Sequence, residues 1–208
     1  MNLNHPEVTQ QALDIVRSGD PFQWYVITLA VIVLYIYGHE YERGNYKAIA
    51  AGLSLYMVHW FVEIVNALIQ HFSGHALWTV PERTAFSIMV GVGIEISLMF
   101  SIAGIVATKL LPKDPKARIA GINSRIFVAV SAAAAAAIIE IFLVRTPAFV
   151  WVYPFWGSFP VFITVYIPFF AAAVYAYDAP LKKSFTFVAV LGAVNLAGLV
   201  VFGLLGWI

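Results

Sequence analysis

Long apolar runs that contain few or no charged residues dominate this chain and limit what it can fold into. A helix needs roughly 20 mostly apolar residues to cross the hydrocarbon core of a bilayer. The chain is 62% hydrophobic and only 11% charged, which leaves too little polar surface to cover a water-soluble fold. The runs therefore predict an all-α fold: a polytopic integral membrane helical bundle.

The spacing of the apolar runs predicts about six transmembrane helices in a single domain that covers residues 1–208. Turn-forming residues separate the runs, as in Leu111-Pro112-Lys113-Asp114-Pro115 and Asp178-Ala179-Pro180. A polar N-terminal segment, residues 1–21, precedes the first run and is compatible with an interfacial helix. The predicted spans are about 22–38, 46–71, 84–110, 122–144, 156–177 and 185–207.

The composition also narrows the functional classes. Cysteine is absent, which excludes disulfides, thiolate metal sites and cysteine nucleophiles. The net charge of +1 and the lack of a basic patch give no indication of nucleic-acid binding. The five histidines do not form the repeated boxes of membrane desaturases, and the HExxH motif of zinc proteases is absent.

The basic residues are unevenly divided between the two sides of the predicted bundle. Nine of the twelve Lys and Arg residues lie on the side that holds the loops 39–47, 109–121 and 178–184, and we call this side the basic end. Basic residues are enriched in cytoplasmic loops. The three loops are therefore predicted to be cytoplasmic, and both termini are predicted to lie outside.

Polar residues inside the apolar runs are the main functional signal, since a charged group at a helix centre costs roughly 2.5–3.5 kcal/mol on insertion scales. On the second predicted span, six small or polar residues recur at steps of three and four, which places them on one stripe of a helix. This stripe is predicted to face protein or water rather than lipid. Its members are Gly52, Tyr56, His59, Glu63, Asn66 and Gln70.

Depth along the helices connects this stripe to residues on other spans. Glu95, on the third span, is predicted to lie within a turn of the depth of Glu63. Glu140, on the fourth span, is level with Asn66, and Asn195 on the sixth is near mid-depth. Sequence alone therefore predicts one buried cluster inside the bundle, in which Tyr56, Asn66, Glu140 and Asn195 position the groups His59, Glu63 and Glu95.

Three interpretations of this cluster stay open. Two carboxyl groups in a dry site do not both ionise cheaply, so one is expected to keep its proton and to serve acid/base chemistry together with His59. Alternatively, His59, Glu63, Glu95 and Glu140 form a nitrogen and oxygen ligand set that suits zinc or iron. A third interpretation is an interhelical hydrogen-bond network that only orients the bundle. The acid/base interpretation requires no cofactor.

One set of residues resembles a known enzyme family. His59 and Glu63, in the pattern His-x-x-x-Glu, followed by a lone glutamate on the next span, Glu95, resemble the emopamil-binding-protein sterol isomerases. Those small multi-span proteins move a ring double bond by protonation and deprotonation. The likeness runs from His59 to Glu95, and Ile64 stands where that pattern has glycine. The resemblance implies proton transfer on a sterol-like molecule.

Taken together, the sequence favours a membrane-embedded enzyme of lipid metabolism, isomerase-like, acting on a lipid, isoprenoid or sterol-like substrate. His59, Glu63 and Glu95 would be its catalytic residues. The expected partners are membrane lipids and an apolar small molecule, and a homo-oligomer or a larger membrane complex is compatible with the chain. A proton- or cation-coupled transporter, a small subunit of a membrane complex and a metal-dependent membrane enzyme are the alternatives.

The orientation can be tested by labelling from outside the cell. A cysteine introduced at Asp114 should not react with a membrane-impermeant maleimide in intact cells, because the loop 109–121 is predicted to be cytoplasmic. The same cysteine should react after the membrane is permeabilised. Labelling of Asp114→Cys in intact cells would show that the predicted orientation is wrong.

Overall fold

The computed structural model describes residues 3–208, and most of them are helical. Four helical segments are long and apolar enough to cross a membrane. They are α3 (Tyr46–Ser73), α5 (Ser124–Leu143), α8 (Leu181–Leu204) and the continuous segment Ser158–Asp178. This last segment joins α6 (Ser158–Val161), the π-helical turn η1 (Phe162–Tyr166) and α7 (Ile167–Asp178). These helices confirm the predicted polytopic bundle.

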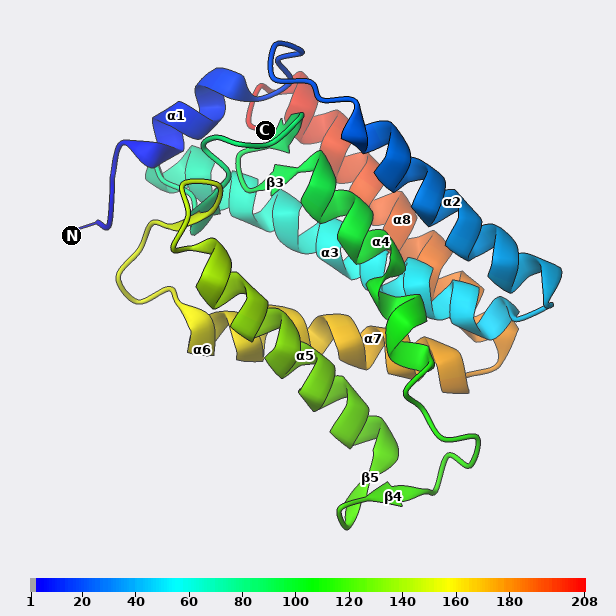
Figure 1. The fold of residues 1–208 in the computed structure, drawn as a ribbon. Coiled ribbons are helices and arrows are strands. Elements are labelled where there is room, and N and C mark those ends of the chain that lie inside the picture. Colours follow the sequence, from blue (N-terminus) through cyan, green and yellow to red (C-terminus); the bar gives the residue numbers. More distant parts are fainter. Residues whose placement is uncertain (1–2) are drawn as a thin grey trace.

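Two further helices complete the bundle. They are α2 (Tyr25–Glu42) and the shorter apolar helix α4 (Ile94–Thr108). Helix α3 is central and packs against α4, α7 and α8, whereas α2 lies over α4 and α5 packs on α7 (Figure 1). The helix count therefore agrees with the prediction of about six spans.

One end of the bundle is covered by short elements, and we call it the capped end. Its two small antiparallel sheets pair β1 (Trp78–Thr79) with β6 (Val150–Trp151), and β2 (Ser87–Met89) with β3 (Val92–Gly93). Helix α1 (Val8–Ile15) lies on them, and both termini are at this end (Figure 1). The hairpin of β4 (Arg118–Ile119) and β5 (Ile122–Asn123) lies at the basic end.

The third predicted span, 84–110, is wrong in its first part. Residues 84–86 are not helical, the β2–β3 hairpin runs from Ser87 to Gly93, and the helix begins only at Ile94. The apolar character that suggested a helix is explained by burial, since Met89, Val90 and Val92 are all at most 3% exposed. Non-helical backbone is tolerated beside a membrane helix when protein covers it. With 15 residues, α4 is about 22 Å long.

The polar N-terminal segment is tied to the cap by backbone hydrogen bonds. The Asn4 amide donates to the Val152 carbonyl at 2.7 Å, and the Arg17 amide donates to the Ser87 carbonyl at 2.8 Å. Val8 and Ala12 of α1 are buried against cap residues. Helix α1 therefore covers the loops of the capped end and packs against them.

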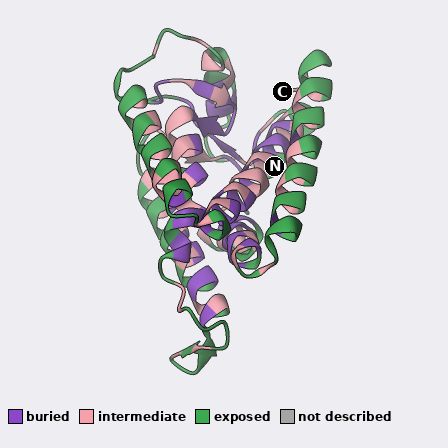
Figure 2. Cartoon of the chain, turned by 90° about the vertical axis from the view of Figure 1, so that its right-hand side faces the viewer, coloured by how far each residue is buried: buried purple, intermediate pink, exposed green. Residues whose placement is uncertain are grey.

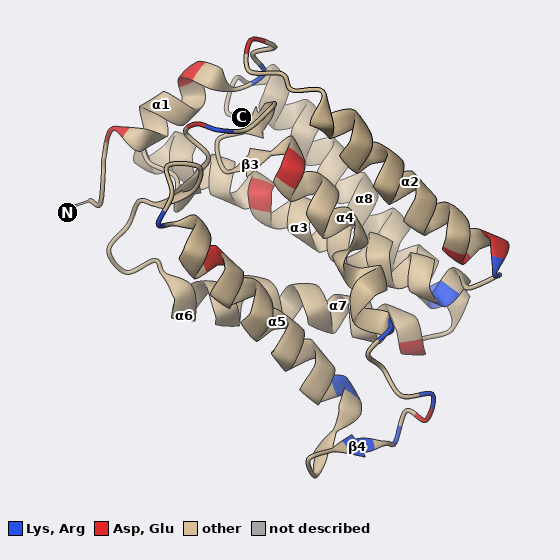
Figure 3. Cartoon of the chain, viewed as in Figure 1, with Lys and Arg blue, Asp and Glu red and all other residues tan. Residues whose placement is uncertain are grey.

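The outward surface of the bundle is apolar. Leu34 of α2 and Leu204 of α8 are 71% and 84% exposed, and Figure 2 shows exposed residues along the outer helices with buried residues gathered inside. An apolar exterior of this kind is what lipid contact requires. Charged residues gather mainly at the two ends of the bundle, with most basic residues at the basic end (Figure 3).

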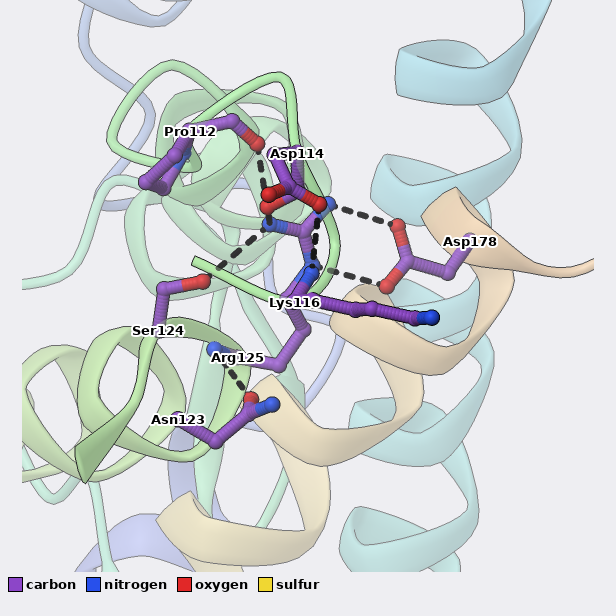
Figure 4. Close-up of polar contacts among 7 residues, drawn as sticks. All are labelled: Pro112, Asp114, Lys116, Asn123, Ser124, Arg125 and Asp178. Atoms are coloured by element: carbon purple, nitrogen blue, oxygen red, sulfur yellow. Dashed lines mark hydrogen bonds and ion pairs between the residues drawn. The ribbon is translucent and has the colours of Figure 1, made fainter. Parts of the chain in front are cut away.

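At the basic end, one arginine ties three segments together. Arg125 of α5 forms a bidentate pair with Asp178 of α7, at 2.8 and 2.9 Å, and also donates to the carbonyls of Pro112 and Asp114 (Figure 4). Bidentate arginine–carboxylate pairs are geometrically specific. This pair anchors the start of α5 to the end of α7.

The close approach of α3 and α4 yields a stability prediction. A Cβ atom added at Gly104 would lie 2.5 Å from the Ala51 carbonyl oxygen, which is backbone and cannot move aside. Gly104→Ala should therefore lower the free energy of unfolding by about 1–3 kcal/mol, measured by denaturant titration in detergent. The control is Gly38→Ala in α2, where nothing lies within 4 Å of the added Cβ. Equal stability of the two variants would contradict this packing.

Candidate functional site

The polar stripe of α3 points into the bundle. His59, Glu63 and Asn66 are 1%, 5% and 0% exposed, as expected for polar groups that avoid lipid. Asn66 accepts a hydrogen bond from the Leu77 amide at 2.8 Å and donates to the Trp78 carbonyl at 3.0 Å. It thereby fastens the segment that carries Trp78 to α3.

Glu63 and His59 are neighbours whose polar atoms are incompletely paired. The Nδ1 atom of His59 lies 3.7 Å from Oε1 of Glu63. Among the described residues, neither ring nitrogen of His59 nor Oε2 of Glu63 has a hydrogen-bond partner. Such orphaned buried atoms are rare in folded proteins and call for an explanation such as a bound molecule.

Glu140 of α5 is the second buried carboxyl group at this depth and is fully paired. The Trp151 indole donates to its Oε1 at 2.5 Å, and the Tyr166 hydroxyl donates to its Oε2. Glu140 is 5% exposed. Its two donors come from β6 and from the π-helical turn, so three separate segments hold this carboxyl group in place.

Glu63 and Glu140 both line one cavity of about 390 Å³, which lies between α4, α5 and α7. This volume is within the range of small-molecule sites, roughly 300–1,000 Å³. Trp78 and Tyr166 line the cavity beside the two carboxyl groups, and the other lining residues are apolar. The cavity therefore has a polar end toward the cap and an apolar body.

The cavity reaches the side of the bundle between α4 and α5. Four lining residues are also exposed on the surface, by 44% to 62%: Met99, Val106, Leu110 and Ile139. Helices α4 and α5 scarcely touch each other. Since the outer surface of these helices is apolar, the opening faces the lipid.

The alanine run Ala132–Ala137 of α5 has two roles. Ala133 and Ala137 are buried in the core, where small residues let helices approach closely. Ala132, Ala135 and Ala136 instead line the cavity. Their small side chains leave the space that the cavity occupies.

The π-helical turn explains how Tyr166 reaches the polar end. The Ile167 amide donates to the carbonyl of Phe162, five residues earlier. Pro168 follows, which has no amide hydrogen and whose ring would clash with the Thr164 carbonyl in a regular α-helix. The wider turn relieves this clash and brings residues before and after it, Val161 and Phe169 among them, to the same cavity.

His59 lies behind the cavity wall rather than in it. Its ring packs against Phe100 and Phe169, at centroid distances of 4.7 and 5.8 Å, and both phenylalanines line the cavity. Its side chain therefore meets the cavity only through Glu63.

The structure places Glu95 apart from this site. Its carboxyl group accepts hydrogen bonds from the Tyr25 hydroxyl, from Thr84 Oγ1 at 2.6 Å and from the Ala85 amide at 2.7 Å. It does not line the cavity. Glu95 therefore holds the start of α4 to α2 and to the segment before β2.

Two other predicted positioning residues also lie elsewhere. The Tyr56 hydroxyl bonds to Ser97 Oγ at 2.8 Å, which joins α3 to α4, and Asn195 Nδ2 donates to the Met57 carbonyl at 2.8 Å, which joins α8 to α3. Both are helix-to-helix ties. Within residues 3–208, no group of three His, Asp or Glu side chains is placed to hold a metal ion, the set His59, Glu63, Glu95 and Glu140 included.

Sequence reasoning missed the roles of Trp78 and Trp151. Both lie in the short strands of the cap, outside every predicted span. The Trp151 indole donates to Glu140, and Trp156 stacks on Trp78 with 5.6 Å between the ring centroids.

Comparisons with known proteins agree with the membrane fold. A family model described as "Uncharacterized membrane protein family" matches residues 6–204. A protein from Archaeoglobus fulgidus, described as "Uncharacterized protein", is 44% identical over 209 residues, which cover 97% of this chain and 99% of that protein. No solved structure matches.

The pairing of Glu140 yields a prediction about stability. Tyr166→Phe and Trp151→Phe should each lower the free energy of unfolding by about 1–3 kcal/mol, because each leaves a buried carboxyl oxygen without its donor. Chemical unfolding in detergent measures this. Tyr175→Phe, at a tyrosine that is 56% exposed on α7, is the control and should change little. A loss no larger than that of the control would show that the two hydrogen bonds are unimportant.

Proposed function

The chain belongs to this membrane protein family, and we propose that it is a membrane-embedded acid/base enzyme. Its substrate would be an apolar, membrane-dissolved molecule such as a lipid, an isoprenoid or a sterol-like compound. The observation that carries the proposal is the position of Glu63 and Glu140 at the closed end of an apolar cavity that opens toward lipid.

The two carboxyl groups differ in a way that suits separate roles. Both oxygens of Glu140 accept hydrogen bonds, whereas Oε2 of Glu63 has no partner among the described residues. Glu63 is therefore the group that is free to contact a substrate, and Glu140 is the group whose position is fixed. Pairs of carboxyl groups with different surroundings divide acid and base roles in many enzymes.

The reaction that fits is the movement of a double bond. One carboxyl group in its acid form would give a proton to one carbon of the alkene, which leaves a positive charge on the other alkene carbon. The second carboxyl group, in its base form, would take a proton from the next carbon beyond that charge, and the double bond would form there. Substrate and product then have the same composition, and neither an oxidant nor a cofactor is needed. Exclusion of water by the apolar wall would protect the reactive intermediate.

His59 is proposed as a positioning residue. It lies next to Glu63 and behind the aromatic wall, so it acts on the substrate only through Glu63. The 3.7 Å between His59 and Glu63 is longer than a hydrogen bond. A small movement of either side chain would close it, and the imidazole would then orient the carboxyl group and exchange a proton with it.

The proposal differs from the sequence-based hypothesis in its second carboxyl group. Glu140 replaces Glu95, which was one of the three residues behind the resemblance to sterol isomerases. The description of the matching family names no activity. The proposal therefore rests on the cavity and its two carboxyl groups.

We also propose that the basic end faces the cytoplasm, which the charge distribution favours.

Glutamine variants test the chemistry. The protein, reconstituted in vesicles made from a total lipid extract in D₂O, should place deuterium on a carbon of one lipid species, detected by mass spectrometry. Glu63→Gln and Glu140→Gln should each abolish this labelling, because glutamine keeps the shape but cannot exchange a proton. His59→Ala should slow it by about 10²–10⁴-fold.

Glu95→Gln is the matched control, because Glu95 lies outside the cavity. This variant should keep the labelling, provided that it elutes at native size in detergent. Labelling that survives in both Glu63→Gln and Glu140→Gln would contradict the proposed chemistry. Loss of labelling in Glu63→Gln and Glu95→Gln, with labelling kept in Glu140→Gln, would restore the sequence-based assignment of Glu95.

A further inference from the structure

The polar end of the cavity offers hydrogen-bond acceptors, while its donors are already used. The Tyr166 hydroxyl donates to Glu140, and the indole of Trp78 donates to the Gly91 carbonyl at 3.2 Å. The Trp151 indole also donates to Glu140. Among the residues that line the cavity, the buried side-chain atom without a hydrogen-bond partner is Oε2 of Glu63, which belongs to a carboxyl group.

The cavity has no cationic side chain in its wall. Of the residues that the structure describes, no Lys, Arg or His lines it. The histidine nearest in sequence to Glu63, His59, is separated from the cavity by Phe100 and Phe169. Most lysines and arginines lie at the basic end (Figure 3). Those toward the capped end, Arg17, Arg83 and Arg145, do not line the cavity.

These two facts restrict the polar group of a ligand. A carboxylate or phosphate at the polar end would be buried beside two carboxyl groups with neither a cation nor a free donor to compensate, and such burial is strongly unfavourable. A hydroxyl or an ammonium group would instead donate a hydrogen bond to Oε2 of Glu63. The remaining length of the ligand would lie along the apolar wall of α4 and α5.

We infer that this site selects amphiphiles whose single polar group is a hydrogen-bond donor, an alcohol or an amine, and excludes fatty acids and phosphorylated lipids. The inference rests on the proposed function, because it names the substrate class of the same cavity. It identifies Glu63 and Glu140 as the residues that determine this selectivity.

A series of probes with one chain and four head groups tests the inference. The probes are a farnesyl chain that ends in a hydroxyl, an amine, a carboxylate or a phosphate, added to the full-length protein in nanodiscs. Binding is followed by tryptophan fluorescence, with Trp78→Phe used to assign the signal to the cavity. The alcohol or the amine should saturate the signal, and the carboxylate and phosphate should bind at least about tenfold more weakly.

Glutamine variants should change this order. In Glu63→Gln, in Glu140→Gln and in the double variant, a source of repulsion toward the carboxylate is removed. The ratio of the Kd of the carboxylate to the Kd of the alcohol should therefore fall by about tenfold. Glu95→Gln should leave the order of the four probes unchanged. The single variants keep the test valid where the double variant does not fold.

Three results would overturn the inference. They are a phosphate or carboxylate that binds as tightly as the alcohol, binding of none of the four probes, and an unchanged order in all the Glu63 and Glu140 variants. Failure of the proposed function is distinguishable from these. In that case, the alcohol or amine would bind as predicted, but no deuterium would enter a lipid.

Discussion

Helix α5 is held by polar anchors near its two ends, and the cavity depends on this arrangement. Arg125 pairs with Asp178 at the basic end (Figure 4), and Glu140 accepts hydrogen bonds from Tyr166 and Trp151 toward the cap. Between these anchors α5 packs on α7 and scarcely touches α4. Polar ties between membrane helices are strongly directional, whereas apolar contacts inside lipid provide little preference for one neighbour over another. The anchors therefore determine where α5 lies, and the space beside α4 follows from that position.

The cap contributes as much to the site as the helices do. Trp78 and Trp151 are paired residues of the β1–β6 sheet. Trp78 lines the polar end of the cavity, and the Trp151 indole donates to Glu140. Asn66 of α3 holds the segment before this sheet through two hydrogen bonds. A carboxyl group near the end of a membrane helix thus receives one of its two donors from the cap, Trp151, and the other from the neighbouring span, Tyr166.

Hydropathy was sufficient to predict the bundle, its helix count and the inward face of α3, because each depends on a period or a length that can be counted along the sequence. Depth could be counted as well, and Glu63, Glu95 and Glu140 were grouped on that basis. The rotation of each helix about its own axis, which decides where a side chain points, could not be obtained from the sequence in this way. Glu95 turns toward Tyr25 and Thr84, while Glu140 turns toward the cavity. The stretch 84–93, which contains the β2–β3 hairpin, was mistaken for helix because buried strands are as apolar as membrane helices, and period alone does not separate the two.

The π-helical turn at Phe162–Tyr166 has a consequence for how this sequence can vary. Each residue of a regular helix turns the chain by about 100°, and the wider turn accommodates one extra residue without changing the rotation of the helix on either side of it. A one-residue deletion or insertion elsewhere in the span Ser158–Asp178 would rotate everything on one side of it. Tyr166 would then leave Glu140, or the phenylalanines of α7 would leave the cavity wall. Substitution of one apolar residue for another in this span has a smaller effect on the site, since it does not change which side chains face the cavity. Among homologous chains that keep the site, length in this span should be far more constrained than residue identity.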